Sequence, residues 1–478
     1  MGLAAVDYVV VVAYLLGITA FGSYFARFQK DTRDYFLTDR SVPWWGVCFT
    51  IVATETSTLT FIGVPAAAYA GDFTFLQLAL GYMIGRLLVS VWFIPAYFRG
   101  ELVTSYELLR RRFGPAVKNL AAVIFLVTRS CADGIRLFAT ALVIGVVTGV
   151  PVTWVIIVLG LAMIVYTERG GVSAVIWTDV VQMFIYLAGA LVVFAALLTR
   201  IPGGWATVVS TGLAHDKFRV VDWSLDPLRL YTVWTGVLGG VALTMATHGT
   251  DQFLVQRLLA ARSAREASRG LVLSGVLVFA QFLLFLAIGV MLFTYYQLEP
   301  LATPLVRTDA ILPTFVGSAL TATGAAGLIV AAIVSAALSP SLNAMAATTV
   351  TDLYVPYVNP SACEATLMRV SRLATVAWGL VQLAIAIAAQ WMSQSVLDAG
   401  LAVLSLSAGP VLGAFVAAAL LDRLSGRAVF AGMVTGMVLL VAVWSSGAIA
   451  WTWYAFIGSV VTLFVASVLS RVGLGTVR

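Results

Sequence analysis

Two apolar stretches of the chain are interrupted by polar residues that could bind an ion or a solute. The first, residues 53–65, carries Glu55 among several hydroxyl residues, and the second, residues 244–252, carries His248. One interpretation is that the hydroxyl residues only serve helix packing. The other is that both helices are broken, which frees carbonyls for a cation and turns a positive helix end toward an anion. A carboxylate at the depth of Glu55 favours the second interpretation, and we expect a binding site between the breaks.

Six charged residues lie inside apolar stretches, where an unpaired charge is costly. They are Glu55, Asp133, Asp179, Arg86, Arg129 and Arg136. The spacing of Arg129, Asp133 and Arg136 puts all three on one face of a helix. Mutual pairing of three acids with three arginines would leave no net charge. Alternatively, an arginine binds a carboxylate or phosphate of the solute, because the guanidinium group matches those anions.

The composition shows that these stretches belong to a membrane protein. Of the 478 residues, 61 % are hydrophobic and only 10 % are charged, whereas soluble chains are about 45–50 % apolar and about 25 % charged. These values exclude a soluble enzyme and a disordered chain, and the unbroken apolar runs exclude a porin-like barrel. Three cysteines and two histidines predict neither a disulfide framework nor a metal centre. We therefore expect an all-α polytopic membrane protein.

About thirteen stretches are long enough to cross a bilayer. Their approximate bounds are 6–26, 43–70, 73–98, 118–149, 151–168, 174–199, 230–258, 270–297, 312–350, 369–391, 395–421, 427–447 and 450–470. Each broken stretch opens a group of five spans, and an odd number per group gives the two groups opposite orientations, as in an inverted repeat. The predicted parts are an extra N-terminal helix with a cytoplasmic loop, the first repeat, an extracellular loop, the second repeat and C-terminal helices. They cover residues 1–42, 43–199, 200–229, 230–421 and 422–478 in turn.

The positions of the basic residues predict how the chain faces the membrane. With the N-terminus outside and loops alternating, 20 of the 28 Lys and Arg residues fall on one side, five on the other and three within spans. Basic residues mark the cytoplasmic side. We therefore expect an N-terminus outside and a C-terminus in the cytoplasm, in a plasma membrane of the bacterial inner-membrane type. This topology accounts for the net charge of +6. We therefore expect the chain to contact the lipid bilayer and not a nucleic acid.

Several motifs resemble those of the sodium:solute symporter family, which transports sugars, proline, pantothenate and similar solutes. The matching segments are residues 34–37 with 43–45, 53–65, 166–179, 249–257 and 342–354. The resemblance implies a LeuT-like fold of two inverted five-helix repeats, with one helix before them and a few after. It also implies alternating access, in which sodium moving down its gradient drives solute uptake. Enzymatic activity, a cofactor and an obligate protein partner are not implied, and phosphate-binding loops for ATP are absent.

The resemblance also implies a sodium site between the first and eighth helices of the repeats. Its ligands would be the carbonyl groups of Ala53 and Thr56 and hydroxyl groups of the eighth helix, for which the nearest candidates are Ser335 and Ser339. Asp179 matches a family position that is linked to a second ion site or to the ion exit path. Oxygen ligands of this kind suit a hard cation.

The eighth helix departs from the family pattern. The adjacent hydroxyl pair that is usual in the family falls here on Ala336 and Ala337. Glu55 could replace the missing ligands, because some members carry an acidic residue that binds sodium at this position. The departure keeps a proton-coupled symporter open as an alternative, with Glu55 and His248 as candidate proton carriers.

The resemblance places the solute between the two broken helices. The candidate solute-binding residues are Glu55, Ser57, Thr60, Gln77, Thr247, His248 and Arg136. Thr247 and His248 replace the Tyr and Trp of sugar-transporting members, so an aromatic platform for a hexose is missing. Arg86, Arg129 and Asp133 form either a structural charge network or part of the solute site. We expect sodium-coupled uptake of a small polar organic solute, with a non-transporting sensor and a membrane-embedded transferase as weaker alternatives.

Overall fold

The computed structural model describes residues 4–25, 40–99, 102, 104–301, 305, 307–320, 324–337, 341–392, 395–421 and 424–472. Regular structure in these residues is helical, apart from one isolated bridge between Val42 and Ala261. Within the described ranges, eight helices are long and apolar enough to cross a membrane, or nine if one bent pair counts as a single span. The all-α polytopic class is confirmed. The predicted number of about thirteen spans is not.

The first group of helices begins with an extra helix and then the predicted break. Helix α1 (Ala5–Phe25) precedes α3 (Trp44–Glu55) and α4 (Thr58–Ala70), and α3 and α4 meet at 62°. The chain continues through α5 (Leu76–Phe98), α6 (Tyr106–Phe113), α7 (Pro115–Thr148), α8 (Val152–Arg200) and α9 (Gly204–Ala214). Between α6 and α7, Gly114 has a φ of 86°. Glycine tolerates this left-handed conformation, and Pro115 suits the first position of the next helix.

Helix α8 differs from the prediction. It is helical from Val152 to Arg200, 49 residues, where the sequence predicted two spans, 151–168 and 174–199, joined by a loop at Arg169. The reason is that residues 166–174 contain no proline, and glycine costs a helix only about 1 kcal/mol per residue. A straight helix of this length would measure about 74 Å, which is more than twice the ~30 Å hydrocarbon core. Two apolar parts remain distinguishable within it, Val152–Val165 and Val175–Arg200.

The second group begins with η3 (Val233–Leu238), α10 (Gly239–Gly249) and α11 (Gln252–Leu259), which together form the second broken stretch. It continues with α12 (Ala264–Leu298), η4 (Thr308–Ala310), α13 (Ile311–Ala319), α14 (Ala325–Ala337), α15 (Leu342–Thr348), η5 (Thr349–Tyr354) and α16 (Val355–Tyr357). The last elements are α17 (Glu364–Ala388), η6 (Ala389–Trp391), α18 (Val396–Leu420), α19 (Gly426–Ser446), η7 (Trp451–Trp453) and α20 (Tyr454–Arg471). The predicted span 312–350 is therefore divided among α13, α14 and α15.

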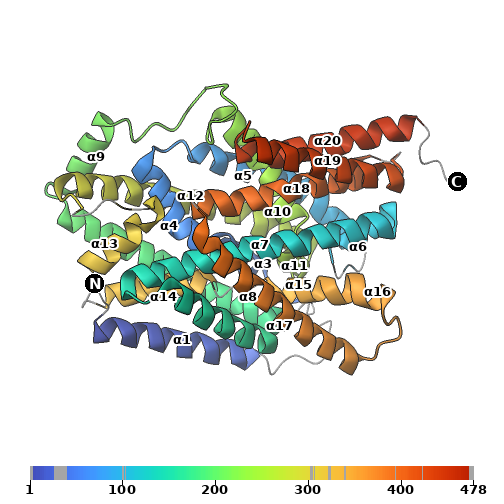
Figure 1. Cartoon of the computed structure of the whole chain (residues 1–478), viewed down its shortest axis with the longest axis horizontal. Helices are drawn as coiled ribbons and strands as arrows, with labels where there is room; N and C mark the ends of the chain where they lie inside the picture. The colour runs from blue at the N-terminus through green and yellow to red at the C-terminus, as the bar shows by residue number, and fades with distance from the viewer. Residues whose placement is uncertain are drawn as a thin grey trace.

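The packing holds both broken helices near the middle of the bundle (Figure 1). Helices α3 and α4 pack against α12, α5 packs along α10, and α18 packs against α7 and α20. Small residues permit the α5–α10 contact, because a Cβ atom on Gly81 would lie 2.9 Å from the Cα of Gly240. Close approach through small residues is the usual way in which membrane helices associate.

The two ends of the bundle carry different elements. Helix α1 begins at the end where α9 and α13 lie, and α20 ends at the other, where α6 and α16 lie (Figure 1). This arrangement agrees with the predicted alternation of loops, in which 200–229 and 99–117 lie on opposite sides. Which end faces the cytoplasm stays a prediction, as do the boundaries of the two repeats.

Candidate functional site

The break between α3 and α4 leaves backbone groups without their helical partners. Thr56 and Ser57 leave the helical conformation, with Ser57 extended at ψ 172°. The Ser57 N–H donates to the carbonyl of Glu55 at 2.9 Å, so the carbonyl of Ala53 loses the donor that a continuous helix would supply four residues later. The Thr56 hydroxyl donates to Gln281 Oε1 at 2.9 Å, which fixes the break against α12. The break thus leaves the carbonyl of Ala53, one of the predicted cation ligands, without its helical donor.

The break between α10 and α11 is different, because other side chains occupy its carbonyls. The Tyr97 hydroxyl donates to the carbonyl of Gly249, and Ser105 Oγ donates to that of Thr250 at 3.0 Å. At the start of α11, the Asp251 carboxylate accepts from the N–H of Phe253 at 2.8 Å as an N-cap. This second break is therefore tied to α5 and to the segment before α6.

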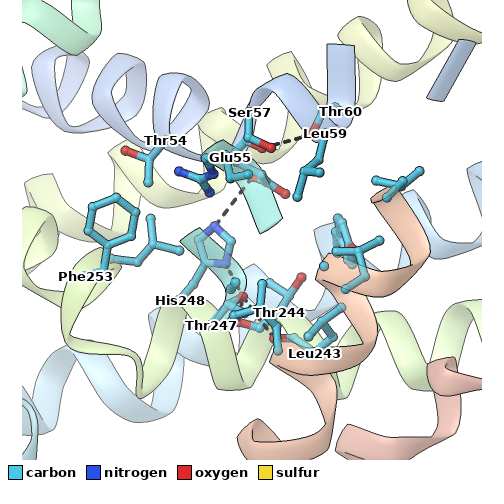
Figure 2. Close-up of a pocket in the computed structure, with 18 of the residues that line it drawn as sticks. Thr54, Glu55, Ser57, Leu59, Thr60, Leu243, Thr244, Thr247, His248 and Phe253 are labelled. Carbon is cyan, nitrogen blue, oxygen red and sulfur yellow. Dashed lines mark hydrogen bonds and ion pairs between the residues drawn. The ribbon is translucent and has the colours of Figure 1, made fainter. Parts of the chain in front are cut away.

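A cavity of about 100 Å³ lies between the two breaks. Its walls come from α3 and α4, α5, α7, α10, α11, α12 and α18, and most of its area is apolar. Figure 2 shows Glu55, Ser57 and Thr60 on one side and Thr244, Thr247 and His248 on the facing helix. The apolar residues of the wall include Leu59, Val64, Phe75, Leu243, Phe253, Leu254, Phe282, Leu397, Leu401 and Leu404.

Glu55, on the cavity wall, is held by two basic side chains from other helices. Its carboxylate forms an ion pair with Arg86 of α5. His248 Nε2 lies 3.5 Å from the same carboxylate oxygen (Figure 2). The Arg86 side chain is 1 % exposed and that of Glu55 13 %. His248 in turn places Nδ1 at 3.0 Å from the Thr247 hydroxyl. Because Arg86 neutralises Glu55, this carboxylate is a poor replacement for the sodium ligands missing at Ala336 and Ala337.

Asp179 pairs with an arginine to which the sequence analysis gave no role. Arg257 of α11 approaches its carboxylate at 2.9 Å, and both side chains are buried. The hydroxyls of Thr50 and Thr54 reach the same oxygen at 2.8 and 3.4 Å. The other oxygen, Asp179 Oδ1, is buried and has no hydrogen-bond partner among the described residues. This carboxylate therefore lies next to the first break, and its Oδ1 atom is available to a ligand.

Two arginines of α7 share one carboxylate unequally. Arg129 lies 3.3 Å from Asp133 and 3.2 Å from Asp251, and its guanidinium stacks over the Phe253 ring. Arg136 approaches Asp133 only to 3.9 Å, and its Nε has no hydrogen-bond partner among the described residues. Ser341 also donates to Asp133. Arg136 is thus the least satisfied of the arginines that line the cavity.

The structure brings most of the predicted solute residues together, with one exception. Glu55, Ser57, Thr60, Thr247, His248, Arg129 and Arg136 line the cavity. Gln77 does not, because its amide donates to the Tyr231 carbonyl at 2.9 Å and accepts from the Asp222 N–H at 3.3 Å. Of Ser335 only the place in α14 is described, and Ser339 lies outside the described residues. Sequence reasoning missed the roles of Asp251 and Arg257, although both stand in a segment whose resemblance to the family was noted.

Two groups of helices that each open on a broken helix, with a cavity between the breaks, define the class of LeuT-like secondary transporters. Within that class, the chain belongs to the sodium:solute symporter family, whose model matches residues 35–436. Its members are sodium-coupled transporters and not enzymes. The family resemblance expected from the motifs is thereby confirmed.

Individual relatives agree with this family. The chain is 30 % identical to the sodium/sialic acid symporter NanT of Aliivibrio fischeri over 471 residues, 96 % of this chain and 92 % of the relative. It is 27 % identical to the sodium-coupled monocarboxylate transporter 2 of Homo sapiens over 442 residues, 91 % of this chain and 71 % of the relative. Among solved structures, a substrate-bound outward-open Na⁺-coupled sialic acid symporter superimposes with a TM-score of 0.91 at 28 % identity, covering 98 % of each chain.

Proposed function

We propose that the chain takes up a small organic monocarboxylate together with sodium, by alternating access across the plasma membrane. The observation that carries the proposal is Arg136. Its side chain is 12 % exposed at the cavity wall, and its nearest carboxylate is at 3.9 Å. A guanidinium in this position can form the paired hydrogen bonds that carboxylates accept.

The walls of the cavity favour a solute with an apolar body. Some of the hydroxyls that face the cavity are already engaged: Thr54 donates to the Thr50 carbonyl, Thr60 to that of Glu55 and Thr247 to that of Leu243. The remaining lining is largely leucine and phenylalanine. Such walls gain free energy from burying apolar surface, at about 25 cal/mol per Å². A monocarboxylate with an apolar body fits them better than a solute with many hydroxyl groups.

The charges around the cavity explain why an anion would enter with a cation. Three charged side chains line it, Glu55, Arg129 and Arg136, and they form ion pairs with Arg86, Asp133 and Asp251. This set carries no net charge, so a bound carboxylate adds one negative charge at a depth where uncompensated charge is costly. A sodium ion bound nearby restores neutrality. Coupling then follows from electrostatics, because each ion lowers the cost of binding the other.

The cation would bind at the first break. The freed carbonyl of Ala53, the carbonyl of Thr56 and a hydroxyl of α14 form the proposed site, and Thr58 of α4 contacts α14 through the Ile333 carbonyl at 3.0 Å. The free Oδ1 of Asp179 supports a second cation position or an exit path on the same side. The names of the relatives, which pair sodium with sialic acid and with monocarboxylates, agree with a sodium-coupled anion.

Proton coupling is the second candidate, and one observation favours it. His248 lies between Glu55 and Thr247, in contact with both, so a proton could move between buried groups at the cavity. The same contacts would also hold His248 simply as a wall of the cavity.

Binding and uptake measurements test both candidates. Purified protein is heated with lactate, benzoate, sialic acid, proline or glucose, in sodium and in potassium at constant pH. We expect stabilisation by a monocarboxylate only in sodium, since a ligand at 100 times its Kd adds about 2.7 kcal/mol. Equal stabilisation by a neutral solute would contradict the proposal. Uptake into proteoliposomes that follows an imposed proton gradient, and ignores sodium, would select the second candidate.

A further inference from the structure

An open groove on the surface of the bundle runs along the first turns of α12, beside the start of α3. Its volume is about 620 Å³, and we call it the α3–α12 groove. The residues that line it are Trp44, Ser268, Arg269, Val272, Leu273 and Val276. We propose that this groove binds an anionic phospholipid, with the phosphate at Arg269 and an acyl chain along the apolar wall. The lipid is neither the solute nor the coupling ion, so the inference goes beyond the proposed function and does not rest on it.

Arg269 supplies a positive charge that has no partner in the described part of the chain. Its side chain is exposed, and it forms no hydrogen bond or ion pair with any residue that the structure describes. Arg262 differs, because its guanidinium donates to the Ser41 carbonyl at 3.0 Å. A guanidinium offers parallel N–H groups that match the oxygens of a phosphate. Arg269 is therefore suited to a phosphate group from outside the chain.

The charges around Arg269 also favour an anion. Residues 262–269 hold three arginines and one glutamate. Arg265 is exposed one turn before Arg269. The carboxylate of this segment, Glu266, already accepts the N–H of Trp44 at 3.1 Å. Basic residues at the ends of membrane helices attract anionic lipid headgroups, and this segment belongs to the predicted cytoplasmic side.

The apolar wall of the groove continues from Arg269 along the span. Leu273 and Val276 come four and seven residues after Arg269 on α12, so the three side chains share one face of the helix. Leu273 and Val276 are both exposed. Because α12 is long and apolar enough to cross a membrane, these side chains face the acyl chains of a bilayer. From Arg269 to Val276 the groove extends about 10 Å along the helix, which suits the first part of an acyl chain.

Trp44 forms the opposite wall of the groove, at the start of α3. Its side chain is 38 % exposed, and tryptophan is enriched where headgroups meet acyl chains. Helices α3 and α12 pack together, and just after α3 the Thr56 hydroxyl donates to Gln281 of α12 at 2.9 Å. A lipid in contact with both Trp44 and Arg269 therefore bridges the two helices that hold the first break.

Lipid binding to the purified full chain tests the inference in the absence of sodium and solute. Native mass spectrometry follows titrations with phosphatidylglycerol, phosphatidylcholine and glycerol 3-phosphate. For the unmodified protein we expect phosphatidylglycerol to bind most tightly, since the choline group cancels the phosphate charge and glycerol 3-phosphate has no acyl chain.

Three variants locate the lipid. Arg269→Gln should raise the Kd for phosphatidylglycerol about tenfold or more, because the charge-assisted hydrogen bonds are lost. Val272→Trp fills the groove while keeping Arg269, and it should also raise the Kd several-fold. Arg427→Gln is the matched control, since Arg427 is exposed at the start of α19, on the same predicted side and away from the groove. Its Kd should stay within about twofold of the unmodified protein.

Several outcomes would overturn the inference. An unchanged Kd in Arg269→Gln or in Val272→Trp removes the lipid from the groove. An equal loss in Arg427→Gln shows that lipid responds only to the general surface charge. Phosphatidylcholine that binds as tightly as phosphatidylglycerol shows that the headgroup charge is not recognised, and glycerol 3-phosphate that does so points to a soluble phosphate ester. None of these results bears on solute uptake, so either proposal can fail while the other stands.

Discussion

Arg86 and Arg136 lie in the same bundle but in very different surroundings. Arg86 is buried against Glu55 and His248, whereas Arg136 faces the cavity and meets its nearest carboxylate only at 3.9 Å. A guanidinium that is already paired stabilises the protein, and one that is poorly paired can bind a ligand. The two arginines should therefore respond differently to substitution.

We predict that Arg136→Gln weakens solute binding and leaves stability nearly unchanged. Loss of a hydrogen bond to a charged group costs about 1.5–3 kcal/mol, which corresponds to roughly 10- to 100-fold in Kd. The measurement is sodium-dependent binding of lactate, with Arg136→Lys expected to be intermediate. Arg471→Gln, on an exposed arginine at the end of α20, is the matched control. An unchanged Kd in Arg136→Gln would remove Arg136 from the site.

For Arg86 the prediction concerns stability. Arg86→Gln leaves the Glu55 carboxylate buried without its cation, and breaking a buried pair from one side costs about 3–5 kcal/mol. The double variant Glu55→Gln with Arg86→Gln removes both charges and should unfold at a higher temperature than Arg86→Gln alone. Thermal unfolding in detergent compares the three proteins. Equal midpoints for the single and double variants would show that the pair is not coupled.

At the scale of elements, the two broken helices have different partners. The α3–α4 break turns the Ser57 N–H away from the Ala53 carbonyl, while the α10–α11 break has its carbonyls bonded to Tyr97 and Ser105. The first can therefore coordinate a cation. The second acts as a joint whose position is fixed by α5 and by the segment before α6.

Tyr97→Phe tests the role of this joint. The substitution keeps the ring against Phe415 and leaves the Gly249 carbonyl without its donor, which should cost about 1–3 kcal/mol of stability. Tyr8→Phe, at an exposed position of α1, is the control. Thermal unfolding of both variants gives the comparison. A Tyr97→Phe protein as stable as the control would mean that water or another group satisfies the carbonyl.

At the scale of the whole molecule, the charge distribution and the two ends of the bundle point to one orientation. The end that holds α6 and α16 carries the basic cluster Arg110, Arg111 and Arg112. Cys363 is exposed and precedes α17 at the same predicted side, whereas Cys48 is buried and Cys131 half-buried. The Thr366 hydroxyl lowers the pKa of the Cys363 thiol, so more of it is thiolate and reactive near neutral pH.

We therefore predict that a membrane-impermeant maleimide labels Cys363 in inverted membrane vesicles and not in right-side-out vesicles. Ser210→Cys, on exposed α9, should show the opposite pattern when Cys363 is replaced by Ala. Mass spectrometry of the labelled protein reads out both sites. Labelling of Cys363 from the outside would reverse the proposed topology.

Local polarity was enough to predict both breaks. A carboxylate or histidine in an otherwise apolar stretch signals a break within a few residues, and the structure places the breaks next to Glu55 and His248. Which charged residues pair with one another was harder to predict. Asp179 joins Arg257, 78 positions away, and Arg129 joins Asp251, 122 positions away, and such distances leave no pattern in a single sequence.

Gln77 is a second case in which the sequence could not identify a residue's partners. It was a candidate solute contact because the family resemblance places the solute against the helix that follows the first broken one. The structure engages its amide with Tyr231 and Asp222, from the segment before η3. Which polar group is free for a ligand depends on what the rest of the chain brings to it.

The sequence by itself determined that the chain is a helical membrane protein with two broken helices, and it predicted that basic residues gather on one side. These features follow from the free energy of placing each short segment in lipid or in water, which depends mainly on the segment itself. Only the tertiary structure decided that Glu55 is neutralised by Arg86 and that Arg136 remains available at the cavity. A charge in a medium of low dielectric must find its partner, and that partner comes from whichever distant helix the fold packs against it.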